Sequence, residues 1–229
     1  MGSNMRMDFM RVQKYSPWHD VESITDSEHY VNAVVEIPRG TQEKFEVSTK
    51  EDWNSIKQDL VEDGSMRKLR YDGKGDPKNP FDFNGMPYAY GMIPRTFEDP
   101  VRKMEVITTR IGQRVEDRMV IGGDRDPLDI YILSDRELPV GLCKCKVIGI
   151  IHYVDGDEID YKIIAVDSAY TDVDNINELG DLKNTLIFQN ALEELLNWLK
   201  YYKTVDNNGN PLPQPRFDSK IGRIIKGRS

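Results

Sequence analysis

The period of the hydrophobic residues changes once along the chain, and this change limits the folds open to it. Short runs rich in β-branched residues, bounded by Gly, Pro, Asn or Asp, recur up to residue 167. Between Asp181 and Lys203, apolar residues recur at three- and four-residue steps, which predicts an amphipathic helix. The pattern is therefore mainly β and predicts a small β-barrel or curled sheet with helices packed outside. The predicted strands are Val31–Ile37, Lys44–Val47, Val106–Thr109, Met119–Ile121, Ile130–Leu133, Cys143–Ile151 and Tyr161–Asp167.

The length of the chain suits one domain with additions. Its 229 residues can bury a full core. We expect an N-terminal arm over residues 1–15, a single domain over 16–229, and an extended C-terminal tail from about residue 206. A shorter helix is expected over Thr49–Val61 after a Ser/Thr cap, and the Pro/Gly-rich segment 72–87 is expected to be an exposed loop.

Composition argues against several classes of protein. Hydrophobic residues make up 38% and charged residues 31%, which is typical of a soluble globular protein. No apolar run approaches the ~18–20 residues that would span a bilayer. The net charge of −8 argues against a sequence-independent grip on nucleic acid. Cys143 and Cys145 cannot build a disulfide framework and are expected in the core, so a reducing compartment, the cytoplasm, is the default.

The stretch from Asp124 to Asp129 places three carboxylates within six residues. Two unit charges about 4 Å apart at an effective dielectric near 20 repel by roughly 4 kcal/mol, so a fold that gathers them needs a compensating cation. All-oxygen clusters favour hard ions such as Mg²⁺, Mn²⁺ or Ca²⁺. The alternative is an acidic surface turn. An EF-hand does not fit, because Asp129 stands where its loop needs Gly and Asp135 where it needs Glu.

Acidic and basic side chains share faces on the predicted strands. An extended backbone puts Asp160 and Lys162 on one face, and it does the same for Lys44 and Glu46. This pairing suits a polyanionic substrate held through metal ions, because Mg²⁺, Lys and Arg all neutralise phosphate oxygens. Further acids and donors are Glu36, Asp155, Arg70, Tyr202 and Lys203. The alternative for Glu36 is an acid that faces solvent, for Tyr202 a core residue, and for Lys203 a cation near a helix C-terminus.

Together these segments resemble the soluble family I inorganic pyrophosphatases of the eukaryotic branch. The resemblance covers most of residues 16–205, and it rests on the order and spacing of the segments more than on any one of them. The matching segments are Trp18-His19-Asp20, Val35–Arg39, Lys44 with Glu46, Lys68-Leu69-Arg70, Tyr90-Gly91, Phe97–Pro100, Asp124–Asp129, Asp155 with Asp160 and Lys162, and Tyr202-Lys203.

The resemblance implies an enzyme that hydrolyses inorganic diphosphate to two phosphates on a five-stranded OB-like barrel flanked by helices. It implies three to four Mg²⁺ ions per site, with Mn²⁺ or Zn²⁺ as substitutes and Ca²⁺ as an inhibitor, and it implies a homodimer. Some similar protist proteins reside in acidic calcium-storing organelles through N-terminal extensions. Such an organelle is the alternative to the cytoplasm as the location of this protein.

The resemblance also implies a role for individual residues. Asp126 is expected to be the general base. One activating metal is expected on Asp124, Asp129 and Asp160, with Asp129 also touching a second. The remaining metal residues are Asp155 with Asp160 for a third ion, Glu46 for a fourth and Glu36 in support, and the phosphoryl groups are expected to contact Lys44, Arg70, Tyr90, Lys162, Tyr202 and Lys203.

Three positions depart from the pattern of that family. Arg125 stands where a small or uncharged residue is usual, Met86 where tyrosine is usual, and Gly156 where an acid is common. Tyr88 is expected to replace the missing tyrosine, and the two acids after Gly156 are expected to replace the missing charge. No predicted metal ligand is lost, so activity remains the expectation.

Other function classes stay open at the level of sequence. One is a metal-dependent hydrolase of longer polyphosphates or nucleotides, particularly with Zn²⁺. Another is an OB-type barrel that binds oligonucleotides, although a basic, aromatic binding face is not evident. A substrate panel and a low-salt single-strand binding assay distinguish these classes from a diphosphatase.

Overall fold

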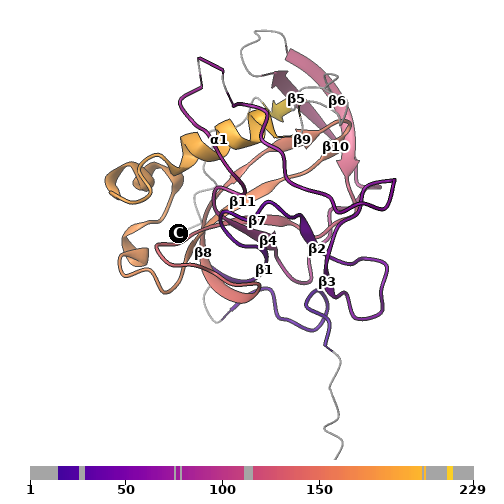
Figure 1. Cartoon of the computed structure of the whole chain (residues 1–229), viewed down its shortest axis with the longest axis horizontal. Coiled ribbons are helices and arrows are strands. Elements are labelled where there is room, and N and C mark those ends of the chain that lie inside the picture. Colours follow the sequence, from indigo (N-terminus) through magenta and orange to yellow (C-terminus); the bar gives the residue numbers. More distant parts are fainter. Residues whose placement is uncertain are drawn as a thin grey trace, which may run out of the picture.

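Five strands close into the barrel at the centre of the molecule (Figure 1). Around the barrel their order is β1-β4-β7-β11-β8; β7 and β11 are parallel, and the other neighbouring pairs are antiparallel. The prediction of a five-stranded barrel is confirmed. The computed structural model describes residues 15–25, 29–74, 76–77, 79–110, 116–202, 204 and 216–218. The barrel strands are β1 (Tyr30–Ile37), β4 (Ala89–Met92), β7 (Asp129–Leu133), β8 (Gly141–Ile151) and β11 (Lys162–Asp167).

Both faces of β7 are buried. Ile130 and Ile132 join a cluster of small and medium apolar residues that also holds the two cysteines, as predicted for them. The alternate residues Tyr131 and Leu133 join a larger cluster that extends to helix α1 (Ala191–Tyr201). Successive side chains of a strand point to opposite faces, so one run of apolar residues serves both clusters.

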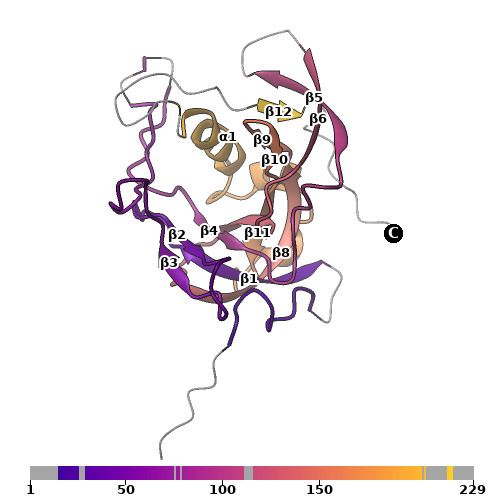
Figure 2. The ribbon, with the colours of Figure 1, turned by 90° about the vertical axis from the view of Figure 1, so that its right-hand side faces the viewer.

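Helix α1 covers one side of the barrel (Figures 1 and 2), as the sequence predicts. It begins at Ala191, however, and not at Asp181. The earlier segment forms the short 3-10 helices η1 (Val173–Asn175) and η2 (Leu179–Asn184). The Asp181 carboxylate accepts hydrogen bonds from the backbone N–H groups of residues 177 and 178, which fixes a turn before η2.

The expected helix over Thr49–Val61 is wrong. This segment instead contains β3 (Ile56–Gln58), which pairs antiparallel with β2 (Phe45–Val47). Asn54 explains the hairpin: its φ is +45°, which an α-helix does not accommodate, and its buried amide donates to the carbonyl of Ser48 at 2.9 Å. A local polar contact therefore overrides the helix propensity of the surrounding residues.

A second set of strands, in the order β10-β6-β5-β12-β9, stands beside the barrel (Figure 2). One strand lies within the segment expected as a C-terminal tail, and it pairs with β5 and β9. The N-terminal arm and most of that tail lie outside the described residues. No helix in the described part of the chain is long and apolar enough to cross a membrane. These strands are β5 (Met104–Arg110), β6 (Glu116–Gly123), β9 (Tyr153–Asp155), β10 (Glu158–Ile159) and β12 (Arg216–Asp218).

Candidate active site

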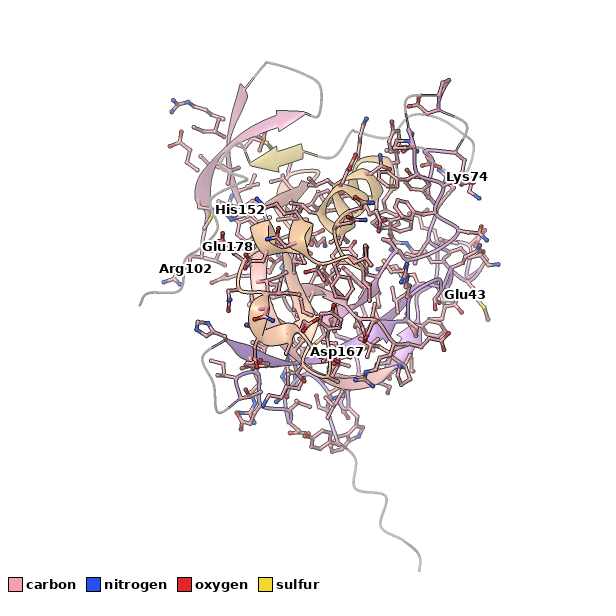
Figure 3. All side chains as sticks on the ribbon, turned by 90° about the vertical axis from the view of Figure 1, so that its left-hand side faces the viewer. Glu43, Lys74, Arg102, His152, Asp167 and Glu178 are labelled. Carbon is pink, nitrogen blue, oxygen red and sulfur yellow. The ribbon has the colours of Figure 1, made fainter. Side chains whose placement is uncertain are left out.

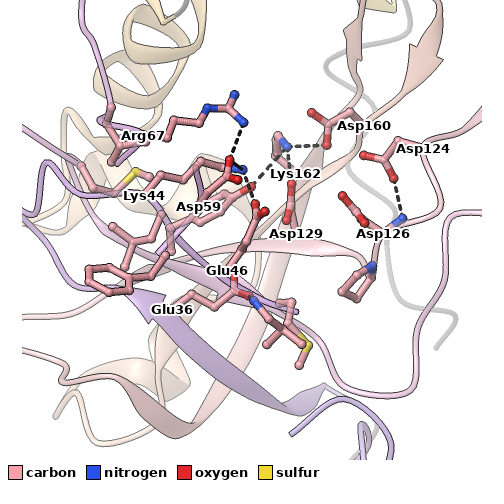
Figure 4. A pocket seen from close by; sticks show the side chains of 18 of the residues that line it. Glu36, Lys44, Glu46, Asp59, Arg67, Asp124, Asp126, Asp129, Asp160 and Lys162 are labelled. Carbon is pink, nitrogen blue, oxygen red and sulfur yellow. Dashed lines mark hydrogen bonds and ion pairs between the residues drawn. The ribbon is translucent and has the colours of Figure 1, made fainter. Parts of the chain in front are cut away.

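A cavity of about 590 Å³ gathers charged side chains from segments far apart in the sequence (Figure 4). All residues expected here from the sequence line it, with two exceptions: Arg70 lies outside the lining, and Lys203 lies outside the described residues. The lining includes the acids Glu36, Glu46, Asp59, Asp124, Asp126, Asp129, Asp155 and Asp160, the cations Lys44, Arg67 and Lys162, and the phenols Tyr90 and Tyr202.

The acidic loop between β6 and β7 brings two aspartates to the cavity wall. The backbone N–H of Asp126 donates to Oδ1 of Asp124 at 2.9 Å. The backbone of Glu98 makes two hydrogen bonds to this loop. Its N–H donates to the carbonyl of Asp126 at 2.9 Å, and its carbonyl accepts from the N–H of Arg125 at 3.0 Å. The residue between the aspartates, Arg125, has a φ of +76°. This backbone conformation directs the two neighbouring carboxylates into the cavity (Figure 4).

Lys162 is the buried cation at the centre of the acids. The register of β11 on β7 places it beside Asp129, and its ammonium contacts the carboxylates of Asp129 and Asp160. Burial opposes a charge on this lysine, but the two aspartates outweigh burial and hold the pKa of Lys162 well above its usual range. Its ammonium also lies 3.5 Å from the hydroxyl of Tyr90. One lysine thus balances part of a larger acidic cluster.

Three further acids of the site have raised pKa values. Burial, followed by the charges of Asp124 and Asp160, raises the pKa of Glu98 to about 9. Burial also raises the pKa of Glu36 to about 8. Partial burial, followed by the charges of Asp124 and Asp129, raises the pKa of Asp126 to about 6. Burial is the first cause of all three raised pKa values, and repulsion between neighbouring carboxylates adds to it; bound cations would relieve this repulsion.

The donor set fits a hard divalent cation. Glu98, Asp124 and Asp160 each offer a carboxylate oxygen, and these oxygens lie within 4.8 Å of one another. Carboxylate oxygens without thiol or imidazole are the ligands that Mg²⁺ and Mn²⁺ prefer. The expected cluster of Asp124, Asp129 and Asp160 is brought to the same cavity. The arrangement can therefore hold divalent ions beside basic side chains that neutralise a phosphorylated ligand.

The opposite wall carries the basic groups. Lys44 contacts Glu46, and its Nζ lies 3.6 Å from Oδ2 of Asp59. A guanidinium nitrogen of Arg67 lies 2.7 Å from the same oxygen. The Tyr202 ring stacks on the Trp198 ring of α1 with a centroid distance of 5.4 Å, so the helix end positions this phenol.

Three residues of the site were missed from the sequence. Asp59 and Arg67 line the cavity but stand in the segment expected as a helix and just after it. Glu98 belongs to a matching segment, Phe97–Pro100, yet no role was expected of it. Its side-chain oxygen accepts from the N–H of Tyr161 at 3.1 Å. Glu98 is only 7% exposed, and no local sequence pattern indicates its role, because its partners are distant in the sequence.

The departures from the family pattern have structural counterparts. Met86 lines the cavity. The hydroxyl of Tyr88 bonds to Glu194 of α1, and Tyr88 is not part of the lining, which does not support a replacement for the missing tyrosine. Gly156, with a φ of +60°, makes the β9–β10 turn. The two acids after it line a different hollow, beside Lys103, and so do not add charge to this cavity.

Comparison with known proteins gives consistent matches. A family model described as inorganic pyrophosphatase matches residues 33–220. The inorganic pyrophosphatase of Bos taurus is 32% identical over 210 residues, which cover 91% of this chain and 64% of that protein. The chain therefore spans less than two thirds of the length of this curated relative.

Two solved structures show the same likeness in three dimensions. A type I inorganic pyrophosphatase from Toxoplasma gondii superposes with a TM-score of 0.69 at 27% identity, covering 90% of this chain and 78% of that one. A vacuolar soluble pyrophosphatase from Trypanosoma cruzi, truncated in its N-terminal domain and in complex with PPi, superposes with a TM-score of 0.70 at 25% identity. That match covers 92% of this chain and 72% of the other.

Proposed function

The chain belongs to the inorganic pyrophosphatase family, and from this premise we propose that it hydrolyses inorganic diphosphate to two orthophosphates with Mg²⁺. One observation carries the proposal: carboxylates from segments far apart in the sequence line a single cavity together with basic groups. The Trypanosoma cruzi relative was solved with PPi, which supports the same ligand here. Phosphoanhydride hydrolysis by water also fits the lining, in which the described residues include no Cys or His and, besides tyrosines, only Ser48 and Thr49 as hydroxyl residues.

The family implies a divalent metal cofactor, and we assign its ligands within the cavity. Asp124, Asp129 and Asp160 would hold one activating ion, and Asp129 would also be a ligand of a second. Asp155 with Asp160 would hold a third ion together with the substrate, Glu46 would hold a fourth, and Glu36 would support this group from β1. When bound, such ions lower the pKa of water and neutralise phosphoryl oxygens. Three to four Mg²⁺ ions per site are proposed; Mn²⁺ and Zn²⁺ substitute, and Ca²⁺ inhibits because its shell is larger and looser.

The side chains of the chain carry the remaining steps. Asp126 accepts the proton of the attacking water, and a pKa of about 6 keeps it mostly ionised at neutral pH. Lys44 and Lys162 bind phosphoryl oxygens, on which charge spreads in the transition state. Tyr90, Tyr202 and Lys203 complete the contacts to the two phosphoryl groups. The leaving phosphate needs neutralisation more than protonation, so basic side chains suffice on that side.

Phosphate release from diphosphate, titrated with Mg²⁺, tests the proposal. The wild-type protein is expected to release two phosphates per diphosphate only when Mg²⁺ is present. Asp126→Asn removes the proton acceptor with little change in shape, so kcat is expected to fall by about 10²–10⁴-fold. Leu142→Ala, an exposed change on β8, is the matched control. Turnover without divalent ions, or full activity in the Asp126→Asn variant, contradicts the proposal.

A substrate panel separates this function from its alternatives. Tripolyphosphate and nucleoside triphosphates are compared with diphosphate under Mg²⁺ and under Zn²⁺, and diphosphate with Mg²⁺ is expected to give the highest kcat/KM. Single-stranded DNA at low salt is expected not to bind, because the cavity wall is acidic. Preference for a longer chain or a nucleotide assigns the site to another hydrolase class.

The assembly and the location are finer proposals that rest on the resemblance. We propose a homodimer and a cytoplasmic location, with an acidic calcium-storing organelle as the alternative. Sedimentation equilibrium gives the mass of the assembly directly. Imaging of the tagged protein in its source cells distinguishes the two locations.

A further inference from the structure

We infer that Trp198 and Tyr71 are positioning residues that hold the phenol of Tyr202 in the cavity, and that the loop after Tyr71 supports them from outside. The inference rests on the proposed function, in which the hydroxyl of Tyr202 contacts a phosphoryl group. Tyr202 lines the cavity, and so does Trp198, which is only 1% exposed. Tyr71 is buried as well but is not part of the lining, so any effect it has on the ligand passes through other residues.

The ring of Trp198 stacks on two tyrosine rings. Its centroid lies 5.4 Å from that of Tyr202, with 17° between the planes, and 5.6 Å from that of Tyr71, with 5° between the planes. The indole N–H of Trp198 is buried and meets no acceptor among the residues that the structure describes. The flat ring of this tryptophan, rather than its polar atom, therefore makes the contacts to Tyr202, and another flat ring is expected to serve in its place.

Backbone contacts bring Tyr71 and Tyr202 together. Tyr202 is the C-cap of α1, and its N–H donates to the carbonyl of Trp198 at 2.8 Å. Tyr202 also forms a β-bridge with Tyr71, and the N–H of Asp72 donates to the carbonyl of Tyr201 at 3.0 Å. These bonds fix the backbone of Tyr202 but not its rotamer. The rings on which Tyr202 stacks select the rotamer that reaches the cavity.

The described part of the segment 72–87, which was expected to be an exposed loop, packs against Tyr71. The ring of Phe83 meets the Tyr71 ring edge to face, with 5.0 Å between the centroids, and it meets the Trp198 ring at 5.8 Å. The side-chain amide of Asn79 donates to the hydroxyl of Tyr71 at 2.7 Å. Lys74 of the same loop is exposed at the edge of the molecule (Figure 3). The inner side of the loop thus holds Tyr71 against Trp198.

Binding of methylenediphosphonate, a diphosphate analogue that cannot be hydrolysed, is measured by calorimetry with Mg²⁺. Tyr202→Phe removes only the hydroxyl and is expected to raise the Kd by about 10- to 100-fold, because a hydrogen bond to a charged ligand is lost. Trp198→Leu is expected to raise the Kd by about 5- to 20-fold through a displaced hydroxyl. Trp198→Phe keeps a flat ring and is expected to stay within about threefold of wild type. Lys74→Gln is the control in the loop, with a Kd within about twofold.

A double-mutant cycle separates positioning from a general loss of structure. If Trp198 acts through the hydroxyl of Tyr202, adding Trp198→Leu to Tyr202→Phe changes the Kd by less than about twofold, although the melting temperature still falls. Phe188→Leu removes another buried ring, which packs on Tyr170 and does not line the cavity. It is expected to lower the melting temperature while the Kd stays within about twofold. Tyr71→Leu repeats the cycle with the ring that lies outside the lining, and the same pattern is expected.

A measurement without ligand reports the position of Tyr202 directly. With 3-fluorotyrosine at position 202, one narrow fluorine resonance is expected in the wild-type background and with Trp198→Phe. A split or broadened resonance is expected with Trp198→Leu, because the ring then exchanges between rotamers. A shift alone does not count, since removal of a neighbouring ring changes the magnetic environment.

Two results overturn the inference. One is a Trp198→Leu protein that is folded by circular dichroism and binds the analogue as tightly as wild type. The other is a rise in Kd from Trp198→Leu that is equally large with and without the Tyr202 hydroxyl. If Trp198→Leu does not fold, Tyr71→Leu takes its place in each comparison. A wild-type protein that neither binds the analogue nor releases phosphate contradicts the proposed function; the fluorine resonance then tests the positioning alone, and one narrow resonance with Trp198→Leu overturns it.

Discussion

Arg125 holds an unusual backbone conformation between two aspartates of the site. Its φ of +76° is uncommon for a residue with a side chain, and such a conformation costs on the order of 1 kcal/mol. The exposed side chain is not part of the cavity lining, so it contributes no contact there that offsets this cost. The strain is instead tied to the direction of Asp124 and Asp126, which the loop points inward (Figure 4).

Arg125→Asn is therefore expected to stabilise the protein, because Asn tolerates a positive φ far better than Arg. The unfolding free energy from urea denaturation is expected to rise by about 0.5–1 kcal/mol, with kcat close to that of wild type. Arg102→Asn is the matched control: Arg102 is exposed (Figure 3) and is not among the positive-φ residues of the described chain. Equal effects of the two substitutions contradict the strain argument.

At the scale of elements, the spacing of the hydrophobic residues, two for strands and 3.6 for helices, identified most of the strands and the helix. This spacing failed where a contact with a distant part of the chain determines the local structure. β4 (Ala89–Met92) was not predicted, because Gly91 weakens its strand signal. The fold needs this glycine, since a Cβ there would lie 1.8 Å from the carbonyl oxygen of Val34 on β1. The misplaced helix over Thr49–Val61 has the same origin, because the buried Asn54 fixes a hairpin.

The helical stripe makes a testable distinction between two leucines. Both Leu186 and Leu195 fit the predicted period, but Leu195 lies on the buried face of α1, whereas Leu186 precedes the helix and is 84% exposed. Leu195→Ala is expected to lower the unfolding free energy by about 2–5 kcal/mol, through lost burial and a cavity. Leu186→Ala is expected to stay within about 0.5 kcal/mol of wild type. Thermal and urea denaturation measure both, and equal losses contradict the difference in burial between the two leucines.

At the scale of the whole molecule, the sequence predicted the acids that cluster along the chain but not the partners brought by the fold. Asp124, Asp126 and Asp129 lie within six residues, so their proximity was predictable. Asp59, Arg67 and Glu98 meet the site only through pairing of distant segments, for which no local pattern exists. Burial, with a smaller contribution from neighbouring carboxylates, raises the pKa values of Glu36 and Glu98 to about 8 and 9.

These raised pKa values set the sign of a pH effect. An unfolded Glu has a pKa of about 4.3, so between that pH and the folded-state values the folded protein binds more protons than the unfolded chain. Without divalent ions, the contribution of these two groups to the unfolding free energy is therefore fully present below about pH 4.3, and it is lost as the pH rises toward 8–9. Mg²⁺ binds the deprotonated carboxylates, so its stabilisation is expected to grow over the same range.

Urea denaturation at pH 5.5, 7.0 and 8.5, with EDTA or with Mg²⁺, measures this coupling. With EDTA the unfolding free energy is expected to fall as pH rises. With Mg²⁺ above its Kd, each tenfold increase in concentration adds about 1.4 kcal/mol per bound ion. Glu98→Gln is expected to reduce the fall with pH, because a neutral amide replaces the titrating group. Glu43→Gln, at the molecular edge (Figure 3), serves as the control and keeps the wild-type slope. A stability that is flat with pH, or equal gains from Mg²⁺ and from Na⁺ at the same ionic strength, would mean that the acids of the cavity do not act as one divalent-ion site.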